Sequence, residues 1–104
     1  MSDTNISNAF QIFLDEAPAQ AKAWMGSVHG LDQASALDKK TEELAYIAVL
    51  AAARLNSGIP FHVASAKQNG ATREEIISAV LIGLPAVGNA VIQSLPVALD
   101  AFDG

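Results

Sequence analysis

Two side chains suited to proton transfer lie in the central stretch of the sequence. Glu43 interrupts an otherwise apolar stripe, and His62 follows a turn signalled by Asn56-Ser57-Gly58. A carboxylate beside an imidazole can fix the tautomer of the ring while the imidazole moves the proton. The spacing therefore predicts an acid–base couple if two helices cross so that these side chains meet. The alternative is structural, with Glu43 paired to Arg54 or to a partner chain and His62 as a capped interface residue.

A helical hairpin is expected to position these two side chains. Asp38 is a favourable N-cap for a helix that continues to about Leu55, with Glu43 on the same face as Arg54. The Asn56–Gly58 turn ends this helix. We expect Ser57 to cap the next helix, which has Pro60 at its third position and ends at Gly70.

The remaining sequence predicts further helices and no strands. Before the hairpin we expect a helix to about Glu16, capped by Thr4 or Ser7, and another from Ala19 to Val28 that stops at Gly30. After the hairpin we expect a helix from a Thr72–Glu75 capping box to about Leu84, and a last one from Val87 to about Phe102 that is bent at Pro96. Period-2 alternation between turn signals is not evident, so the predicted fold class is all-α. The length predicts a single domain over residues 1–104.

The composition predicts self-association. Apolar residues make up 51% of the chain and charged residues 16%, below the roughly 25% usual in soluble domains. A chain this small has too much surface to bury that many apolar side chains alone. We therefore expect a homo-oligomer.

Several other classes of partner are disfavoured. The net charge is −5 and the six basic residues are scattered, so no nucleic-acid partner is expected. The most apolar run, Ala79 to Ala90, is interrupted by Gly83, Pro85 and Gly88, so no membrane span is expected. The start MSDTNIS has no secretory signal pattern, which makes a cytoplasmic location the expectation.

The sequence offers neither thiol chemistry nor a recognisable metal site. It contains no cysteine, which excludes disulfides, thiolate nucleophiles and cysteine-ligated metal in these residues. The two histidines and Glu43 lack the spacing of ligands on one helix, so we expect no metal site. His29 beside Gly30 is expected to be a surface histidine.

The stretch from Lys39 to Val80 resembles the carboxymuconolactone decarboxylase and AhpD-like alkylhydroperoxidase family. The resemblance is carried by Glu43, Leu44, Ala48, Ala53, Arg54, His62, Ala66 and the segment GATREEI at residues 70–76. It implies an AhpD-like bundle of about five to six helices around a central helix-turn-helix. It also implies packing of the same helices between chains, in a hexamer or a trimer.

The chain departs from this family's peroxidase pattern in a way that decides its chemistry. That pattern has a glutamate, a C-x-x-C pair and a histidine, and by spacing the glutamate and histidine fall on Glu43 and His62. The two cysteine positions fall on Leu55 and Gly58, and a histidine that some members carry between them falls on Ser57. Thiol peroxidase activity needs a sulfur to oxidise, so the resemblance implies the scaffold and its proton relay without the redox step.

The decarboxylase branch of the family needs no cysteine, although it usually carries a further glutamate at the position of Gly58. The expected function is therefore a small-molecule enzyme without a cofactor. In it, Glu43 and His62 would be the acid–base groups on a lactone or carboxylate, and Arg54, Tyr46 and Ser57 would bind the substrate. One alternative is a non-catalytic oligomeric binding or scaffold member of the family. A second is a peroxiredoxin-type family label without the redox cysteines.

Overall fold

The computed structural model describes residues 5–104 and is built from helices alone within that range. In chain order these are α1 (Asn8–Glu16), α2 (Pro18–Ala34), α3 (Lys39–Ala52), the 3₁₀ turn η1 (Asn56–Gly58), α4 (Ile59–Gln68), α5 (Arg73–Leu81), α6 (Leu84–Val87), α7 (Asn89–Ile92) and α8 (Leu95–Asp103). The all-α prediction is confirmed. Six helices have nine or more residues, and α6 and α7 are single turns.

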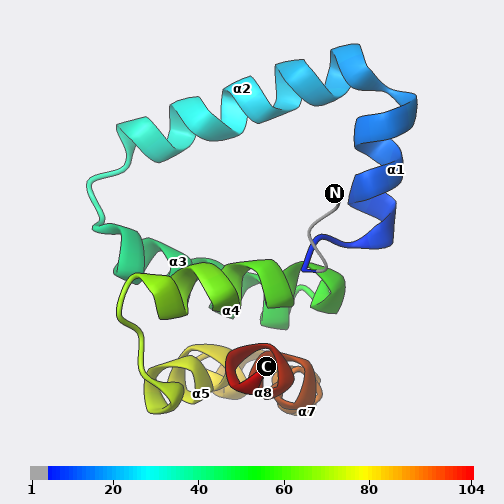
Figure 1. Ribbon diagram of the computed structural model, residues 1–104. Helices are drawn as coiled ribbons and strands as arrows, with labels where there is room; N and C mark the ends of the chain where they lie inside the picture. The colour runs from blue at the N-terminus through cyan, green and yellow to red at the C-terminus, as the bar shows by residue number, and fades with distance from the viewer. Residues whose placement is uncertain (1–4) are drawn as a thin grey trace.

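The hydrophobic core lies among α3, α4, α5 and α8. Helix α3 packs against α4 and α5, and α8 packs against the same two helices from the other side. Figure 1 shows α3 and α4 side by side, with α5, α7 and α8 beneath them. The largest fully buried apolar side chains in this core are Ile47, Ile59, Val63, Ile76, Val80 and Val91.

Three predicted N-caps are present, because each polar side chain satisfies a backbone N–H that the first helical turn leaves free. Ser7 accepts from the N–H of Phe10 at 3.1 Å, and Asp38 accepts from that of Thr41 at 2.8 Å. Thr72 and Glu75 form both bonds of the capping box at the start of α5. The alternative cap Thr4 lies outside the described residues.

The predicted end of α2 and the predicted cap of α4 are wrong. Helix α2 passes through Gly30 to Ala34, because Gly30 keeps a negative φ and the helix continues until Ser35 becomes extended. Ser57 does not cap α4, because it lies inside η1 and Gly58 occupies the cap position without a side-chain bond. Pro60 consequently stands within the first two positions of α4, where its missing N–H costs no hydrogen bond.

The predicted C-terminal helix is also wrong in its extent. The chain forms two pieces, α7 and α8, and Pro96 lies in the first turn of α8 and does not bend a continuous helix. Between the pieces, the buried Ser94 hydroxyl donates to Asn56 Oδ1 at 2.6 Å. This bond ties the turn between α3 and α4 to the C-terminal helices.

Helices α1 and α2 form an arm that stands apart from the core (Figure 1). Ala21 is the one buried residue of α2, and α1 has none. Within residues 5–104, α1 is the helix against which α2 packs. The described helices include none whose length and hydropathy suit a bilayer crossing.

Candidate acid–base site

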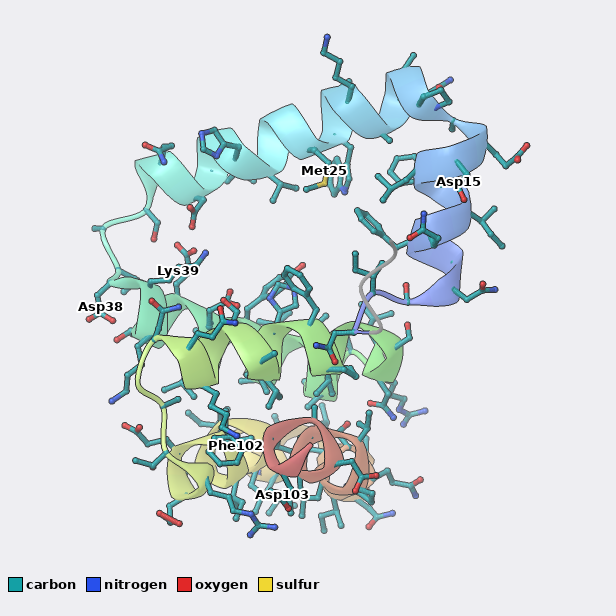
Figure 2. The ribbon with its side chains drawn as sticks, in the orientation of Figure 1. Asp15, Met25, Asp38, Lys39, Phe102 and Asp103 are labelled. Carbon is teal, nitrogen blue, oxygen red and sulfur yellow. The ribbon has the colours of Figure 1, made fainter. Side chains whose placement is uncertain are left out.

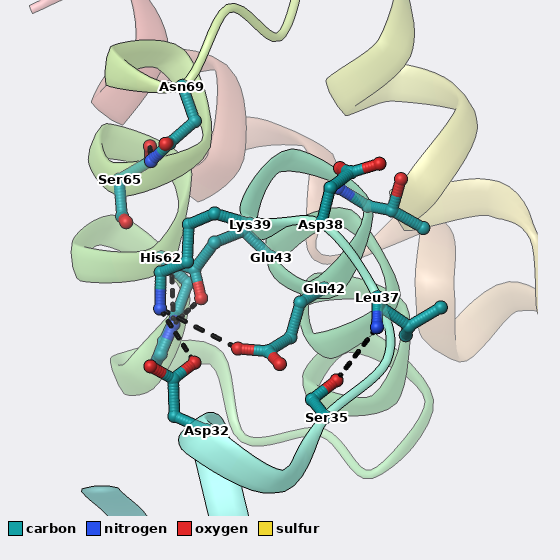
Figure 3. A network of polar contacts seen from close by, with 11 residues as sticks. Asp32, Ser35, Leu37, Asp38, Lys39, Glu42, Glu43, His62, Ser65 and Asn69 are labelled. Carbon is teal, nitrogen blue, oxygen red and sulfur yellow. Dashed lines mark hydrogen bonds and ion pairs between the residues drawn. The ribbon is translucent and has the colours of Figure 1, made fainter.

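Glu43 and His62 meet at the crossing of α3 and α4. The Nδ1 atom of His62 lies 3.2 Å from each carboxylate oxygen of Glu43. Glu43 is only 4% exposed, and the His62 side chain is 24% exposed. Ile47 lies one helical turn after Glu43 on α3, and Val63 directly follows His62 on α4. Because Ile47 and Val63 are both buried in the core, they fix the rotation of the two helices about their axes. The contact that the sequence left open is therefore present in the structure (Figure 3).

The environment of Glu43 holds the carboxyl group in its charged form. Burial is the largest single influence and by itself raises the pKa of Glu43. The hydrogen bond from His62, the Ser65 hydroxyl, and the charges of His62 and Lys39 act in the opposite direction. Together they outweigh burial, and the pKa of Glu43 falls below its ordinary value of 4.5.

An ionised Glu43 determines which nitrogen of His62 carries the proton. A carboxylate can only accept hydrogen bonds, so Nδ1 must be the donor. In the neutral ring, Nε2 then carries the lone pair and can take a proton; in the charged ring, Nε2 can give one up. Nε2 has no hydrogen-bond partner among the described residues. The arrangement can therefore orient a general base or a general acid.

Two polar residues of this site were not predicted from the sequence. Lys39 bonds Asp32 at 3.2 Å and lies 3.6 Å from Glu42, so its charge sits where the end of α2 meets the start of α3 (Figure 3). The Ser65 hydroxyl, on α4, lowers the pKa of Glu43 by hydrogen bonding to its carboxylate. Spacing provided a usable signal, since Lys39 precedes Glu43 by four residues and Ser65 follows His62 by three, one helical turn in each case.

Aromatic rings hold the imidazole on two sides. The Tyr46 ring meets His62 edge-on with centroids 4.3 Å apart, and the Phe61 ring does so at 5.3 Å. Both rings remain substantially exposed, at 45% for Tyr46 and 43% for Phe61. Tyr46 is thus the one predicted substrate-binding residue that the structure brings into contact with the acid–base pair.

Arg54 and Ser57 do not join this pair. Helix α3 ends at Ala52, and Arg54 takes a left-handed conformation with φ 62°, so it leaves the face that carries Glu43. It lines a separate hollow of about 400 Å³ with Asn56, Asn89 and Gln93. Ser57 is exposed in η1 and has no side-chain hydrogen bond among the described residues. The predicted face shared by Glu43 and Arg54 is therefore wrong, because the helix is shorter than expected.

The other basic groups near the hairpin have partners elsewhere. Lys67 donates to the carbonyl oxygen of Phe102 at 2.6 Å and lies 4.5 Å from the centre of that ring. Arg73 forms a two-pronged bond with Asp103, 3.0 Å at each contact. Across residues 5–104, no three histidine, aspartate or glutamate side chains gather as a metal site would require.

Comparison with known proteins extends the resemblance seen in the sequence. Residues 18–100 match the carboxymuconolactone decarboxylase family. The fold matches the crystal structure of an apo carboxymuconolactone decarboxylase family protein from Legionella pneumophila, with TM-score 0.77 and 27% sequence identity. That match covers 91% of this chain and 85% of the other, and so extends into the α1–α2 arm. No curated protein matches the sequence. Since the family match spans most of the sequence, the chain belongs to the carboxymuconolactone decarboxylase family.

Proposed function

We propose that the protein is an acid–base enzyme for a small lactone or carboxylate, with His62 as the proton-transfer group and Glu43 as its orienting partner. One observation carries the proposal: a buried carboxylate is bonded through both oxygens to Nδ1 of a partly exposed histidine. Keeping a charge inside an apolar helix pair is costly unless the charge is used or paired. Here the pairing leaves Nε2 of His62 available to a ligand.

Decarboxylation of a lactone acid gives this couple a defined task. Loss of CO₂ breaks a carbon–carbon bond and leaves its electron pair on the lactone, where a proton must be delivered. Protonated His62 would donate that proton from Nε2, with Glu43 stabilising the imidazolium. Lys39 is a cation whose charge lowers the pKa of Glu43, and it would favour developing negative charge in the substrate. Tyr46 would form one wall of the binding site.

The same site has no route to thiol-dependent peroxide reduction. Leu55 and Gly58 occupy the two positions at which the family's peroxidase pattern has cysteines, and the 104 residues contain no cysteine. Peroxide turnover through a sulfenic acid and a disulfide is therefore not part of the proposal.

A binding or scaffold role is the second candidate, and one observation favours it. Two hollows in the surface, one between α3 and α5 and one around Arg54, are lined by neither Glu43 nor His62. A protein that only binds a ligand would use such a hollow and keep the pair for structure.

An assay of carboxymuconolactone turnover, in which the released CO₂ is measured, tests the proposal. We expect His62→Asn to abolish turnover, because the asparagine amide can replace Nδ1 but offers nothing in place of Nε2. Glu43→Gln should lower kcat while the fold, measured by circular dichroism, is preserved. His29→Asn is the matched control, because this exposed histidine lies outside the site. Turnover that persists in His62→Asn would refute the role of His62 in proton transfer and favour the binding or scaffold hypothesis.

A further inference from the structure

A polar hollow of about 400 Å³ lies between the turn that joins α3 to α4 and the helices α6 and α7. Its volume is within the range of pockets that hold small molecules, roughly 300–1,000 Å³. Its lining, here called the Arg54 hollow, consists of Arg54, Asn56, Val87, Asn89, Ala90 and Gln93. One of these side chains is a cation, three are carboxamides and none of the six is acidic. The hollow therefore offers positive charge and hydrogen bonds without a competing carboxylate.

The guanidinium group of Arg54 is free to bind an anion. Within residues 5–104 it has no acidic partner and no hydrogen bond. The other arginine of the sequence, Arg73, is committed to Asp103, which Figure 2 shows at the end of α8. Their two contacts of 3.0 Å show the geometry that a guanidinium adopts with a carboxylate, two parallel N–H···O bonds. Arg54 has the same donors and lacks the acid.

The backbone at Arg54 has a conformation that suits glycine better than arginine. Its φ is 62°, and it is the one non-glycine residue of positive φ in the described part of the chain. It ends α3 in a Schellman motif, in which the N–H of Leu55 donates to the carbonyl oxygen of Leu50 at 2.9 Å. Glycine is the usual residue at this position, because it has no Cβ to strain. Strained residues concentrate at ligand-binding sites, so an arginine here indicates that its side chain is used.

The three carboxamides add donors and acceptors around the cation. The buried Ser94 hydroxyl donates to Oδ1 of Asn56 at 2.6 Å, so the N–H groups of Nδ2 are what Asn56 offers a ligand. Asn89 and Gln93 are exposed, and neither side chain has a hydrogen bond among the described residues. Each can donate and accept, as the hydroxyl groups of a ligand do.

We propose that the Arg54 hollow is a binding site for a small hydroxylated carboxylate. The carboxylate would bind the Arg54 guanidinium through both oxygens, and the hydroxyl groups would bind the three carboxamides. One cation balances one carboxylate, whereas a phosphate group carries a charge of about −1.5 to −2 at neutral pH and would be only partly neutralised. The site is separate from Glu43 and His62, which do not line it, and it does not depend on the proposed catalysis.

Glycerate, which has one carboxylate and two hydroxyl groups, is the probe that tests this assignment. In a titration at constant ionic strength, we expect the side-chain NH₂ signals of Asn56, Asn89 and Gln93 to shift together in NMR spectra along one saturable curve. Glycerol lacks the carboxylate and acetate lacks the hydroxyl groups, so each should bind at least about tenfold more weakly. The proposal is overturned if glycerate gives no saturable shift, if glycerol or acetate binds as well, or if inorganic phosphate binds more tightly.

Variants of Arg54 separate this site from a general attraction of anions. Arg54→Gln removes the charge and should weaken glycerate binding by about tenfold to a hundredfold. Arg54→Gly removes the side chain where φ suits glycine, so it should fold at least as well as the parent protein and still lose binding. Lys22→Gln is the matched control, because it removes the same charge from an exposed position on α2 outside the hollow. If Lys22→Gln weakens binding as much as Arg54→Gln, or if Arg54→Gly binds like the parent, the hollow is not the site.

Discussion

Replacement of His62 by phenylalanine isolates the interaction that keeps Glu43 charged. Phenylalanine retains a flat ring between Tyr46 and Phe61 and removes the Nδ1 donor. A hydrogen bond to a charged group contributes about 1.5–3 kcal/mol, and a buried ion left without its partner costs about 3–5 kcal/mol. Ser65 and Lys39 still act on Glu43 in this variant. We therefore expect a loss near the lower end, about 2 kcal/mol in the free energy of unfolding at neutral pH.

The pH dependence of this loss follows from the direction of the pKa shift. The pKa of Glu43 lies below its ordinary value of 4.5, so the parent protein has the full contribution at neutral pH and loses it as the pH falls through the lowered pKa. In His62→Phe, burial is opposed less and the pKa of Glu43 should rise. The difference in stability between the two proteins should therefore shrink as the pH falls from about 7 to about 3.

Urea denaturation followed by circular dichroism, at one protein concentration and several pH values, measures this difference. His62→Asn is the matched variant, because its amide can still donate toward Glu43 and should recover most of the lost stability at neutral pH. The carboxyl carbon of Glu43, followed by NMR, should titrate higher in His62→Phe than in the parent. The reasoning is refuted if the stability difference is the same at all pH values, or if asparagine is as damaging as phenylalanine.

Three further substitutions test other parts of the structure by the same denaturation assay. Thr72→Ala removes the N-cap of α5 and should cost about 1 kcal/mol, whereas an unchanged midpoint would mean that the capping box contributes little. Arg54→Gly should stabilise the protein by about 0.5–1 kcal/mol, because φ 62° strains an L-residue and suits glycine; a loss would show that the arginine side chain matters more than the strain. Ile76→Ala, at a fully buried position, should cost about 2–5 kcal/mol, and a loss below 1 kcal/mol would contradict its place in the core.

Structural features that arise from interactions between neighbouring residues are the ones that the sequence predicts best. Asp38 and the Thr72–Glu75 capping box mark helix starts because their side chains bond to N–H groups within three residues. Gly70 ends α4 as expected, with φ 95°. The acid–base pair was also predictable as a candidate, because a glutamate on an apolar stripe needs a partner and His62 is the titratable group beyond the turn.

The remaining features depend on tertiary packing that no local pattern reports. The early end of α3 follows from the turn conformation at Arg54, so the expected alignment of Arg54 with Glu43 fails. The local pattern at Gly30 predicts the end of a helix, yet a glycine is tolerated inside a helix at a cost of about 1 kcal/mol, and α2 continues to Ala34. The separation of α2 from the core could not be predicted either, because the apolar residues of α2 follow helical spacing whether or not they pack on the core.

The bond between Ser94 and Asn56 links the C-terminal helices to the turn before α4, and so to the orientation of the His62 imidazole. Without its acceptor the buried Ser94 hydroxyl would remain unsatisfied, at a cost of about 1–3 kcal/mol, so the bond favours one placement of the loop that precedes α4 against the C-terminal helices. An insertion or deletion in that loop would have to break the bond before it could rotate His62. For the same reason, a truncation that removes Ser94 and the residues after it should make the His62 side chain, 32 positions earlier in the sequence, less ordered.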